Sequence, residues 1–396
     1  MKLNDIAEFV TDKISSSGIS LDRYVTTDSL LQNRRGRETA QNLPPMPCAL
    51  THYRQGDVLV ANIRPYLKKV WYADSEGGCS SDVLAFRAKK GHCPSFLYTV
   101  LMQDAFFDYA MSGAKGSKMP RGDKDQIMRY ELPTFTPMEE ENIGNMMVEI
   151  MSKIKVNRQI NDNLEAMAKQ LYDYWFVQFD FPNEEGKPYK SSGGAMVWNE
   201  KLKRELPKGW DFCFLENLLT IKNGRDHKHL ADGIYPVYGS GGEMRKASEY
   251  LYDGESVLMP RKGSLNNIMY VNEAFWTVDT MFYSEIKQSN CAKYIYYTIK
   301  DIDFTRWDSG TGVPSMTSST LYSIKLVKPQ SEILKKFDEV ISPLFEHMKQ
   351  ISEQNSVLTK QRDELIPLLM NGQASINYHL STLFLSSLYY IETNTN

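Results

Sequence analysis

Two stretches of the chain, 194 residues apart, carry the same helical seam. In each stretch the seam residues recur at alternating spacings of four and three, which places them along one face of a long helix. Two long helices with one register most simply pair with each other, and two unrelated amphipathic helices would not explain ten matched offsets. The first seam comprises Ile143, Met147, Ile150, Ile154, Asn157, Asn161, Leu164, Ala168, Leu171 and Trp175, and the second comprises Phe337, Ile341, Leu344, Met348, Ile351, Asn355, Leu358, Arg362, Leu365 and Leu369.

Polar and aromatic residues interrupt this seam at defined places. Asn161 and Asn355 fall at the same position of the repeat. An asparagine buried in such a seam fixes the register of the helices at a cost in stability, so we expect these two residues to do so. The first seam ends in the aromatic run 171–176, which is either the packed end of the helix pair or a docking face for a partner.

The repeat continues outside the helices. Residues 3–6 open the first half much as residues 215–218 open the second. Each half then contains short runs rich in Val and aromatic residues and flanked by Gly, Asp and Asn, which are typical of strands and turns. A short helix is expected near 95–111 and another near 292–300. The pattern predicts an α+β fold in which two α/β globular domains are separated by a pair of long antiparallel coiled-coil helices, with an internal pseudo-twofold repeat.

These features divide the chain into six segments. Pro137 and the acidic run 139–141 suit the start of the first long helix, because acidic residues favour the positive end of a helix dipole. Pro343 should kink or restart the second helix, and Pro367 should help to end it. The expected segments are a globular domain at 1–137, a long helix at 138–180, a connector at 181–206, a second globular domain at 207–330, a second long helix at 331–372 and a tail at 373–396, to which we assign no function.

The composition limits the class of protein. A chain of 396 residues with 42% hydrophobic content is expected to form a soluble protein of two or three domains. No apolar stretch reaches the roughly 18 residues that a membrane span needs, and the N-terminus lacks the apolar core of a signal peptide. The five cysteines are scattered without a CxxC pair, so we expect neither a zinc site nor a disulfide framework, and a cytoplasmic location.

The net charge of −3 conceals a split between helices and globular domains. Residues 1–137 contain 18 Lys+Arg and 15 Asp+Glu, a net of +3, whereas residues 138–180 contain 4 and 8, a net of −4. The connector, the second globular domain and the last 66 residues have net charges of +1, 0 and −3. The acidic helices are therefore disfavoured as a nucleic-acid surface, which leaves the globular domains as candidates.

The sequence lacks the motifs of common catalytic sites. It has no GxxxxGK[ST] phosphate loop, no HExxH and no Asn-Pro-Pro-aromatic run, and Gly239-Ser-Gly-Gly does not sit in a strand-loop-helix context. The six histidines form no ligand cluster apart from His227 and His229, which flank Lys228 in a polar loop. We therefore expect no catalytic residue and no metal site in this chain.

Basic loops punctuated by glycine occur at parallel places in both halves. Arginine pairs bidentately with guanine, Asn or Gln with adenine, and Lys and backbone amides with phosphate, while Gly lets a backbone approach closely. Ordinary surface loops have the same composition, so it is the parallel placement that favours DNA contact. The loops are 32–37, 62–69 and 115–121 in the first half and 222–228, 238–242, 260–264 and 309–315 in the second.

The helices also limit how the two globular domains can act. A helix of about 40 residues is about 60 Å long. Two domains at opposite ends of an antiparallel pair of such helices could not share one active site. They could touch two separated positions on duplex DNA, whose helical turn is about 34 Å, or bridge two proteins. For DNA contact we select Arg35, Arg64, Lys68, Lys118 and Arg121 in the first domain and Lys222, Arg225, His227, Ser240, Arg261 and Lys262 in the second.

Over about residues 1–372 the chain resembles the DNA-specificity subunit of Type I restriction-modification enzymes. The first half lacks the Leu-Pro-x-Gly-Trp lead that precedes the second, and residues 376–396 extend past the usual end of the family. The resemblance lies in the order and spacing of Asn62-Ile-Arg-Pro-Tyr-Leu-Lys-Lys, Gly116-Ser-Lys-Met-Pro-Arg, Asn163-Leu-Glu-Ala-Met-Ala-Lys-Gln-Leu-Tyr-Asp-Tyr-Trp-Phe, Leu206-Pro-Lys-Gly-Trp, Tyr235-Pro-Val-Tyr-Gly-Ser-Gly-Gly, Arg261-Lys-Gly-Ser and Leu368-Leu-Met-Asn-Gly-Gln.

This resemblance implies that each globular domain is a target-recognition domain reading one half of a split, asymmetric sequence in double-stranded DNA. It implies that the helices set the unread gap and bind methyltransferase subunits, two per chain on grounds of pseudosymmetry, and that ATP-dependent restriction subunits join them. S-adenosylmethionine and ATP would belong to these partners, and the chain itself would hold no cofactor. Two rivals stay open: a coiled-coil protein-protein adaptor without DNA specificity, and a nucleic-acid-modifying enzyme with unrecognised motifs.

Overall fold

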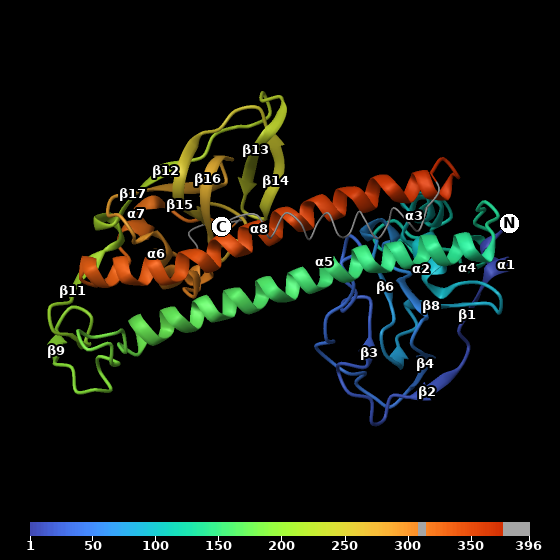
Figure 1. Cartoon of the computed structure of the whole chain (residues 1–396), viewed down its shortest axis with the longest axis horizontal. Helices are drawn as coiled ribbons and strands as arrows, with labels where there is room; N and C mark the ends of the chain where they lie inside the picture. Colours follow the sequence, from blue (N-terminus) through green and yellow to red (C-terminus); the bar gives the residue numbers. More distant parts are fainter. Residues whose placement is uncertain (308–313, 375–396) are drawn as a thin grey trace. The chain divides into compact units, whose positions relative to one another are not determined.

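The computed structural model describes residues 1–307 and 314–374 (Figure 1). The chain forms two compact units, of which the first combines Met1–Gln159 with Ile351–Asn396 and the second is Ile160–Gln350. Both boundaries fall inside the long helices α5 (Pro137–Tyr172) and α8 (Ser331–Met370). Each unit therefore contains a globular part and one portion of each long helix.

The globular part of the first unit is built on a four-stranded antiparallel sheet with the order β1-β8-β5-β6. Its strand β5 is buried along its whole length, because alternate side chains enter two different cores: Val58 and Val60 enter one, and Leu59 and Ala61 the other. The strands are β1 (Ala7–Phe9), β5 (Val58–Ala61), β6 (Val70–Tyr72) and β8 (Val83–Ala88).

A second sheet with the order β2-β4-β7-β3 and several short helices complete this unit. The single helix expected near 95–111 is in fact two helices, because Gln103 takes an extended backbone conformation that ends the first of them. The elements are α1 (Leu3–Ile6), β2 (Lys13–Ser15), β3 (Tyr24–Val25), β4 (Ala49–Tyr53), the 3-10 helix Pro65–Leu67, β7 (Gly77–Cys79), α2 (Pro94–Met102), α3 (Asp104–Ser112) and α4 (Lys124–Ile127).

The second unit repeats this topology. Its six-stranded sheet has the order β12-β17-β15-β16-β13-β14, and the first four strands take the places of β1, β8, β5 and β6. Helix α6 (Ala292–Lys300) follows β17 as α2 follows β8. The internal repeat and the α+β fold class expected from the sequence are thus confirmed. The strands are β12 (Leu219–Asn223), β13 (Asp232–Gly239), β14 (Gly242–Ala247), β15 (Tyr252–Pro260), β16 (Met269–Thr277) and β17 (Met281–Ile286).

The remaining elements of the second unit frame this sheet. Strand β11 pairs with β18 antiparallel, and the connector contains the antiparallel pair β9 and β10. The π-helical segment Asp173–Val177 continues directly from α5. The other bounds are β9 (Met196–Asn199), β10 (Arg204–Pro207), β11 (Asp211–Phe214), β18 (Lys325–Lys328), α7 (Ser318–Tyr322) and the 3-10 helices Leu215–Asn217 and Phe304–Trp307.

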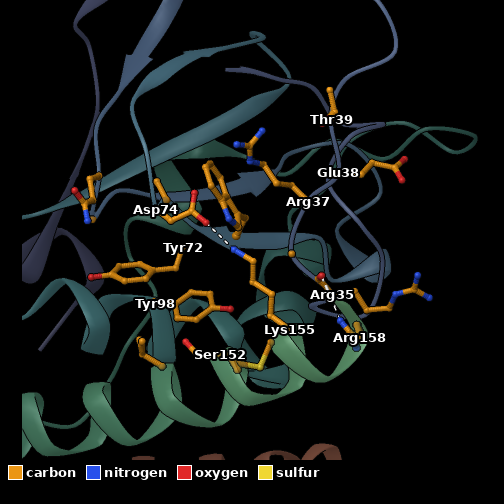
Figure 2. Close-up of a pocket in the computed structure, with 17 residues that line it drawn as sticks. Arg35, Arg37, Glu38, Thr39, Tyr72, Asp74, Tyr98, Ser152, Lys155 and Arg158 are labelled. Atoms are coloured by element: carbon orange, nitrogen blue, oxygen red, sulfur yellow. Dashed lines mark hydrogen bonds and ion pairs between the residues drawn. The ribbon is translucent and has the colours of Figure 1, made fainter. Parts of the chain in front are cut away.

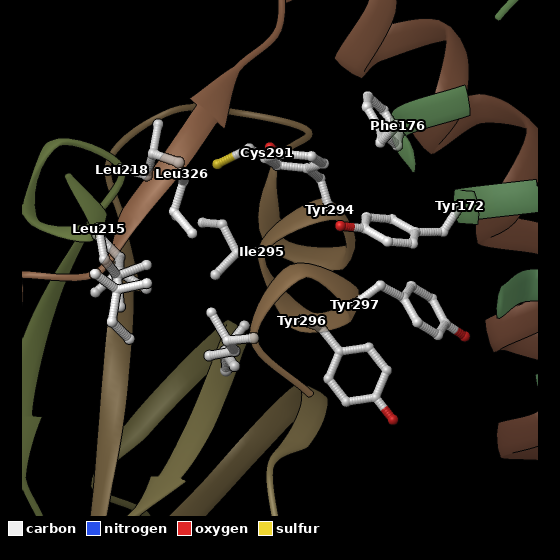
Figure 3. Close-up of a cluster of buried hydrophobic side chains, with 14 of the residues drawn as sticks. Tyr172, Phe176, Leu215, Leu218, Cys291, Tyr294, Ile295, Tyr296, Tyr297 and Leu326 are labelled. Atoms are coloured by element: carbon white, nitrogen blue, oxygen red, sulfur yellow. The ribbon is translucent and has the colours of Figure 1, made fainter. Parts of the chain in front are cut away.

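The aromatic run at the end of α5 lies in the core of the second unit (Figure 3). The ring of Phe176 lies 4.7 Å from that of Tyr294 and 4.8 Å from that of Phe337, centroid to centroid. The Tyr172 hydroxyl donates a hydrogen bond to Thr298 Oγ1 at 3.0 Å. These contacts support the packed-end interpretation of the run.

The portions of α5 and α8 within each unit pack along the predicted seam, and none of its twenty residues is exposed. In the first unit, Asn157 bonds to Asn355 and Met151 to Arg362. The lower residue number on α5 pairs with the higher one on α8, so the two helices run antiparallel. The deeply buried asparagine is Asn157, with 1% of its surface exposed, whereas Asn161 and Asn355 are half-buried. All three take part in bonds between the helices: Asn355 accepts from Asn157, and Asn161 donates to Met348 O at 3.3 Å.

The two prolines of α8 have different outcomes. Of the predicted kink or restart at Pro343, the restart is wrong, because the helix continues unbroken through this residue. Pro343 is exposed, and its neighbours Ile341 and Leu344 pack into the core of the second unit, which offsets the lost backbone hydrogen bond. The helix ends at Met370 as expected, where Gly372 takes the left-handed conformation typical of a helix end. Of the tail, residues 375–396 lie outside the described residues.

Candidate nucleic-acid interface

Three loops of the first unit converge, although they are far apart in sequence. The backbone amide of Asn33 donates to Leu67 O at 2.9 Å, and that of Arg34 to Lys68 O at 2.8 Å. The amide of Arg64 donates to Pro120 O at 2.7 Å. Loops 32–37, 62–69 and 115–121 thus form one body, the first loop cluster, which brings all five candidate residues of the first domain into it.

The backbone of the first loop cluster is strained. Four of its non-glycine residues take positive φ: Asn33, Arg34, Arg64 and Lys68, with values from 51° to 59°. They make up four of the seven such residues in the part of the chain that the structure describes. Each costs on the order of 1–3 kcal/mol, and such strain is concentrated at functional sites, where it fixes side-chain directions in advance.

The candidate side chains of this cluster differ in their contacts. Arg35, Arg64 and Lys118 are exposed. The guanidinium of Arg121 lies 3.1 Å from Asp82 Oδ1, and the Lys68 ammonium pairs with Asp104. The arginines present their donors on the surface, whereas Lys68 is half-buried and helps to hold the cluster together.

Arg34 holds the first loop cluster in place. It is 6% exposed, and its Nε donates to Met102 O at 2.5 Å while its guanidinium pairs with Asp104. A second guanidinium nitrogen lies 3.9 Å from Asp363 of α8. Burial alone would raise the pKa of Asp104, but hydrogen bonds from Lys68 and Arg34 outweigh it and hold the pKa below its usual range. The composition of the loop gave no sign that Arg34, rather than its neighbour Arg35, is the buried member.

The candidate loops of the second unit also converge, around the segment 277–281 between β16 and β17. The amide of Arg225 donates to Thr277 O at 2.8 Å, the amide of Val278 to Tyr238 O at 3.0 Å, and the amide of Arg261 to Thr280 O at 2.8 Å. Loops 222–228, 238–242 and 260–264 together with this segment form the second loop cluster. The segment was not among the predicted loops, although Asp279 precedes β17 much as Asp82 precedes β8.

The candidate side chains of the second cluster are mixed in the same way. Lys222 pairs with Glu285 of the neighbouring strand at 3.3 Å, while Arg225 and Lys262 are exposed. The ring nitrogen Nδ1 of His227 lies 3.3 Å from Arg245 Nε, which holds the ring in the loop. Ser240 and Arg261 are half-buried. Of the predicted loop 309–315, residues 309–313 lie outside the described residues.

The two clusters share one hydrogen-bond frame. The amide of Asn62 donates to Asp82 O at 2.8 Å, as that of Arg261 donates to Thr280 O at 2.8 Å. The carbonyl groups of the same two residues also have equivalent donors: the carbonyl of Asn62 accepts from Gly122 N, and that of Arg261 accepts from Met316 N. The bridge Ile63 to Arg121 corresponds to the bridge Lys262 to Ser315. Equivalent frame positions therefore carry different side chains in the two units.

No group of three or more His, Cys, Asp or Glu side chains suited to a metal ion occurs within residues 1–307 and 314–374. Over the same ranges, no helix is long and apolar enough to cross a bilayer.

Comparison with known proteins finds a family match over part of the chain and relatives over most of it. Residues 207–355 match the family described as Type I restriction modification DNA specificity domain. The specificity subunit of the Type I restriction enzyme MjaIX from Methanocaldococcus jannaschii is 24% identical, over 86% of this chain and 83% of its own length. That of HindI from Haemophilus influenzae is 19% identical, over 94% and 98%.

A solved structure supports the fold independently. The Type I restriction-modification S subunit from M. genitalium is similar with a TM-score of 0.60 at 15% identity, covering 95% of this chain and 96% of that one. Residues 207–355 thus match the Type I restriction modification DNA specificity domain, and the chain over most of its length is similar to specificity subunits of Type I restriction enzymes.

Proposed function

We propose that this chain reads a bipartite, asymmetric DNA target, one half with each loop cluster. The target-recognition domains would be residues 1–137 and 207–330. The observation that carries the proposal is the repeated hydrogen-bond frame with different side chains on it, such as Ile63 where the second unit has Lys262, and Arg121 where it has Ser315. A common frame places each cluster on DNA alike, and different side chains there select different bases.

The long helices would act as a spacer and as a docking surface. Their seam residues fix the register of α5 against α8, which in turn fixes the length of the unread gap. Two methyltransferase subunits would bind, one to each half of the repeat, and ATP-dependent restriction subunits would join them. S-adenosylmethionine would be held by the methyltransferase subunits, and this chain would contribute recognition without catalytic residues of its own.

The proposal is tested by measuring DNA binding of the complex assembled with its methyltransferase subunits. Affinity should fall steeply with salt for any duplex, because phosphate contacts release counterions, and one duplex sequence should bind more tightly at every salt concentration. Binding without salt dependence or sequence preference would contradict the proposal and favour a protein-protein adaptor. DNA modification by the purified chain alone would instead indicate an enzyme.

A further inference from the structure

A cavity of about 560 Å³ in the first unit lies between loop 35–39, the end of β6 and the middle of α5 (Figure 2). Its wall contains four cationic side chains, two carboxylates and three aromatic rings. The cations outnumber the carboxylates by two, which gives the cavity a positive field. The cations are Arg35, Arg37, Lys155 and Arg158, the carboxylates are Glu38 and Asp74, and the rings are Trp71, Tyr72 and Tyr98.

The helix contributes two of these cations from a basic stretch that the net charge of α5 conceals. Residues 150–161 contain Lys153, Lys155 and Arg158 and no acidic residue. The acidic residues of α5 lie before and after this stretch, so the helix is acidic as a whole but basic where it faces the cavity.

The aromatic faces of the cavity are already occupied. The guanidinium of Arg37 lies 4.4 Å from the centroid of the Trp71 ring, and Tyr72 stacks on Tyr98 with centroids 5.3 Å apart. A nucleobase would have to displace these partners in order to stack there. The guanidinium groups suit a phosphate better, because planar guanidinium donors match phosphate oxygens.

The cavity adjoins the first loop cluster. Arg35 belongs to both, and Arg158 donates from its guanidinium to the backbone oxygen of Arg35 at 3.4 Å (Figure 2). Arg35 therefore connects two surfaces: the first loop cluster, which contains the exposed Arg64, and the cavity wall, which contains Arg158. The cavity wall and the first loop cluster thus form adjoining basic surfaces in one unit.

We infer that α5 is part of the DNA interface, and that this cavity takes a backbone phosphate beside the first half-site, with Arg158 as its main helix contact. The inference rests on the proposed function. It assigns to α5 a role beyond spacing: Arg158, with Arg35 and Arg37, neutralises a phosphate and thereby fixes how the duplex lies on the first domain. Contacts of this kind position DNA and carry no base information.

Comparison of the two repeats distinguishes Arg158 from its neighbour Lys155, whose role is structural. Lys155 pairs with Asp74 at 2.8 Å, and Lys349, its counterpart 194 residues later, lies 3.5 Å from Glu273. These two lysines anchor each helix to the globular part of its own unit. Arg158 has Ser352 as its counterpart 194 residues later, so no guanidinium occurs at the equivalent position of the repeat on α8. The inferred phosphate contact from a long helix is therefore expected beside the first half-site and not beside the second.

The test compares Arg158→Gln, Arg158→Lys and the control Lys153→Gln in the complex assembled with methyltransferase subunits. Lys153 is exposed on α5 and does not line the cavity. We expect Arg158→Gln to weaken binding several-fold for specific and nonspecific duplexes alike, and to reduce the slope of log affinity against log salt by about one. The ratio of specific to nonspecific affinity should not change. Arg158→Lys should retain most of the affinity, and Lys153→Gln should bind like the unaltered complex.

Phosphate ethylation interference on the bound duplex locates the contact. The unaltered complex should show a sensitive phosphate beside one half-site only, and Arg158→Gln should lose this sensitivity while keeping the others. Equal affinity, slope and interference in Arg158→Gln and the unaltered complex would overturn the inference and leave the proposed function standing. Absence of sequence preference in the unaltered complex would instead contradict the proposed function.

Discussion

Asn157 of α5 donates a hydrogen bond from Nδ2 to Oδ1 of Asn355 on α8 at 3.0 Å, and its second acceptor, Gln354 Oε1, lies at 2.6 Å. With the buried Arg362, this is a polar contact in the otherwise mainly apolar seam of the first unit, and it joins one register of the two helices. A shift by one heptad would bury at least one of these three amides without a partner, which costs more than the hydrogen bond itself contributes.

Replacing this asparagine should weaken the helix pair. We expect Asn157→Ala to lower the free energy of unfolding by about 1–2 kcal/mol, because the half-buried amides of Gln354 and Asn355 lose their donor. Thermal unfolding followed by circular dichroism measures the change. The exposed neighbour Gln159 offers the control Gln159→Ala, which should unfold with the unaltered protein, and equal midpoints for both variants would contradict the assignment.

Arg34 should affect discrimination in one half-site only. Arg34→Ala removes the contacts to Met102 O, Asp104 and Asp363, so the strained loops 32–37 and 62–69 lose their fixed directions. We expect the penalty for mismatched bases to fall in the first half of the target and to stay unchanged in the second, with Arg34→Lys intermediate. Affinities for duplexes carrying single mismatches in each half measure this.

An exposed arginine of the same unit controls for general loss of charge. Arg54 pairs with Asp12 at 3.3 Å outside the loop clusters, and Arg54→Ala should leave discrimination in both halves unchanged. A loss of discrimination that is equal in both halves for Arg34→Ala would show a global defect rather than a positioning role.

The loop arginines should divide between the two half-sites. We expect Arg64→Ala to cost about 1–3 kcal/mol of specific binding and to relax one base position in the first half. Arg261→Ala should do the same in the second half, since the two residues belong to separate loop clusters. Selection of bound sequences from a randomised duplex measures each change, and relaxation of both halves by either variant would contradict one cluster per half-site.

Cysteine reactivity tests the packing of both units. Burial raises the pKa of the Cys79 and Cys291 thiols to about 12 and that of Cys213 to about 11. A raised pKa keeps these thiols protonated through pH 9, so the reactive thiolate is scarce, whereas Cys48 is exposed. Iodoacetamide should modify Cys48 in the folded protein and leave these three unmodified until unfolding. Mass spectrometry after peptide digestion reads this out, and modification of any of the three at the rate of Cys48 would contradict the packing described.

The regular parts of the structure follow from spacing, and the irregular parts do not. The heptad pattern predicts the seam because burial on a helix depends on position in the repeat. The basic loops are recognisable from composition, but their convergence depends on backbone hydrogen bonds between distant residues, such as Arg64 and Pro120. For the same reason, composition does not distinguish the buried Arg34 from the exposed Arg35, nor Asn157 from Asn161.

Reading of a split target by one chain is tested most directly by mapping methylated bases across the host genome with the gene intact and with it deleted. We predict that deletion removes methylation at a single motif made of two short, different half-sites separated by a fixed gap. Restoring the gene with Arg64→Ala should return the motif with one relaxed base in one half. An unchanged pattern of methylation after deletion, with the methyltransferase subunit present, would contradict the proposed function.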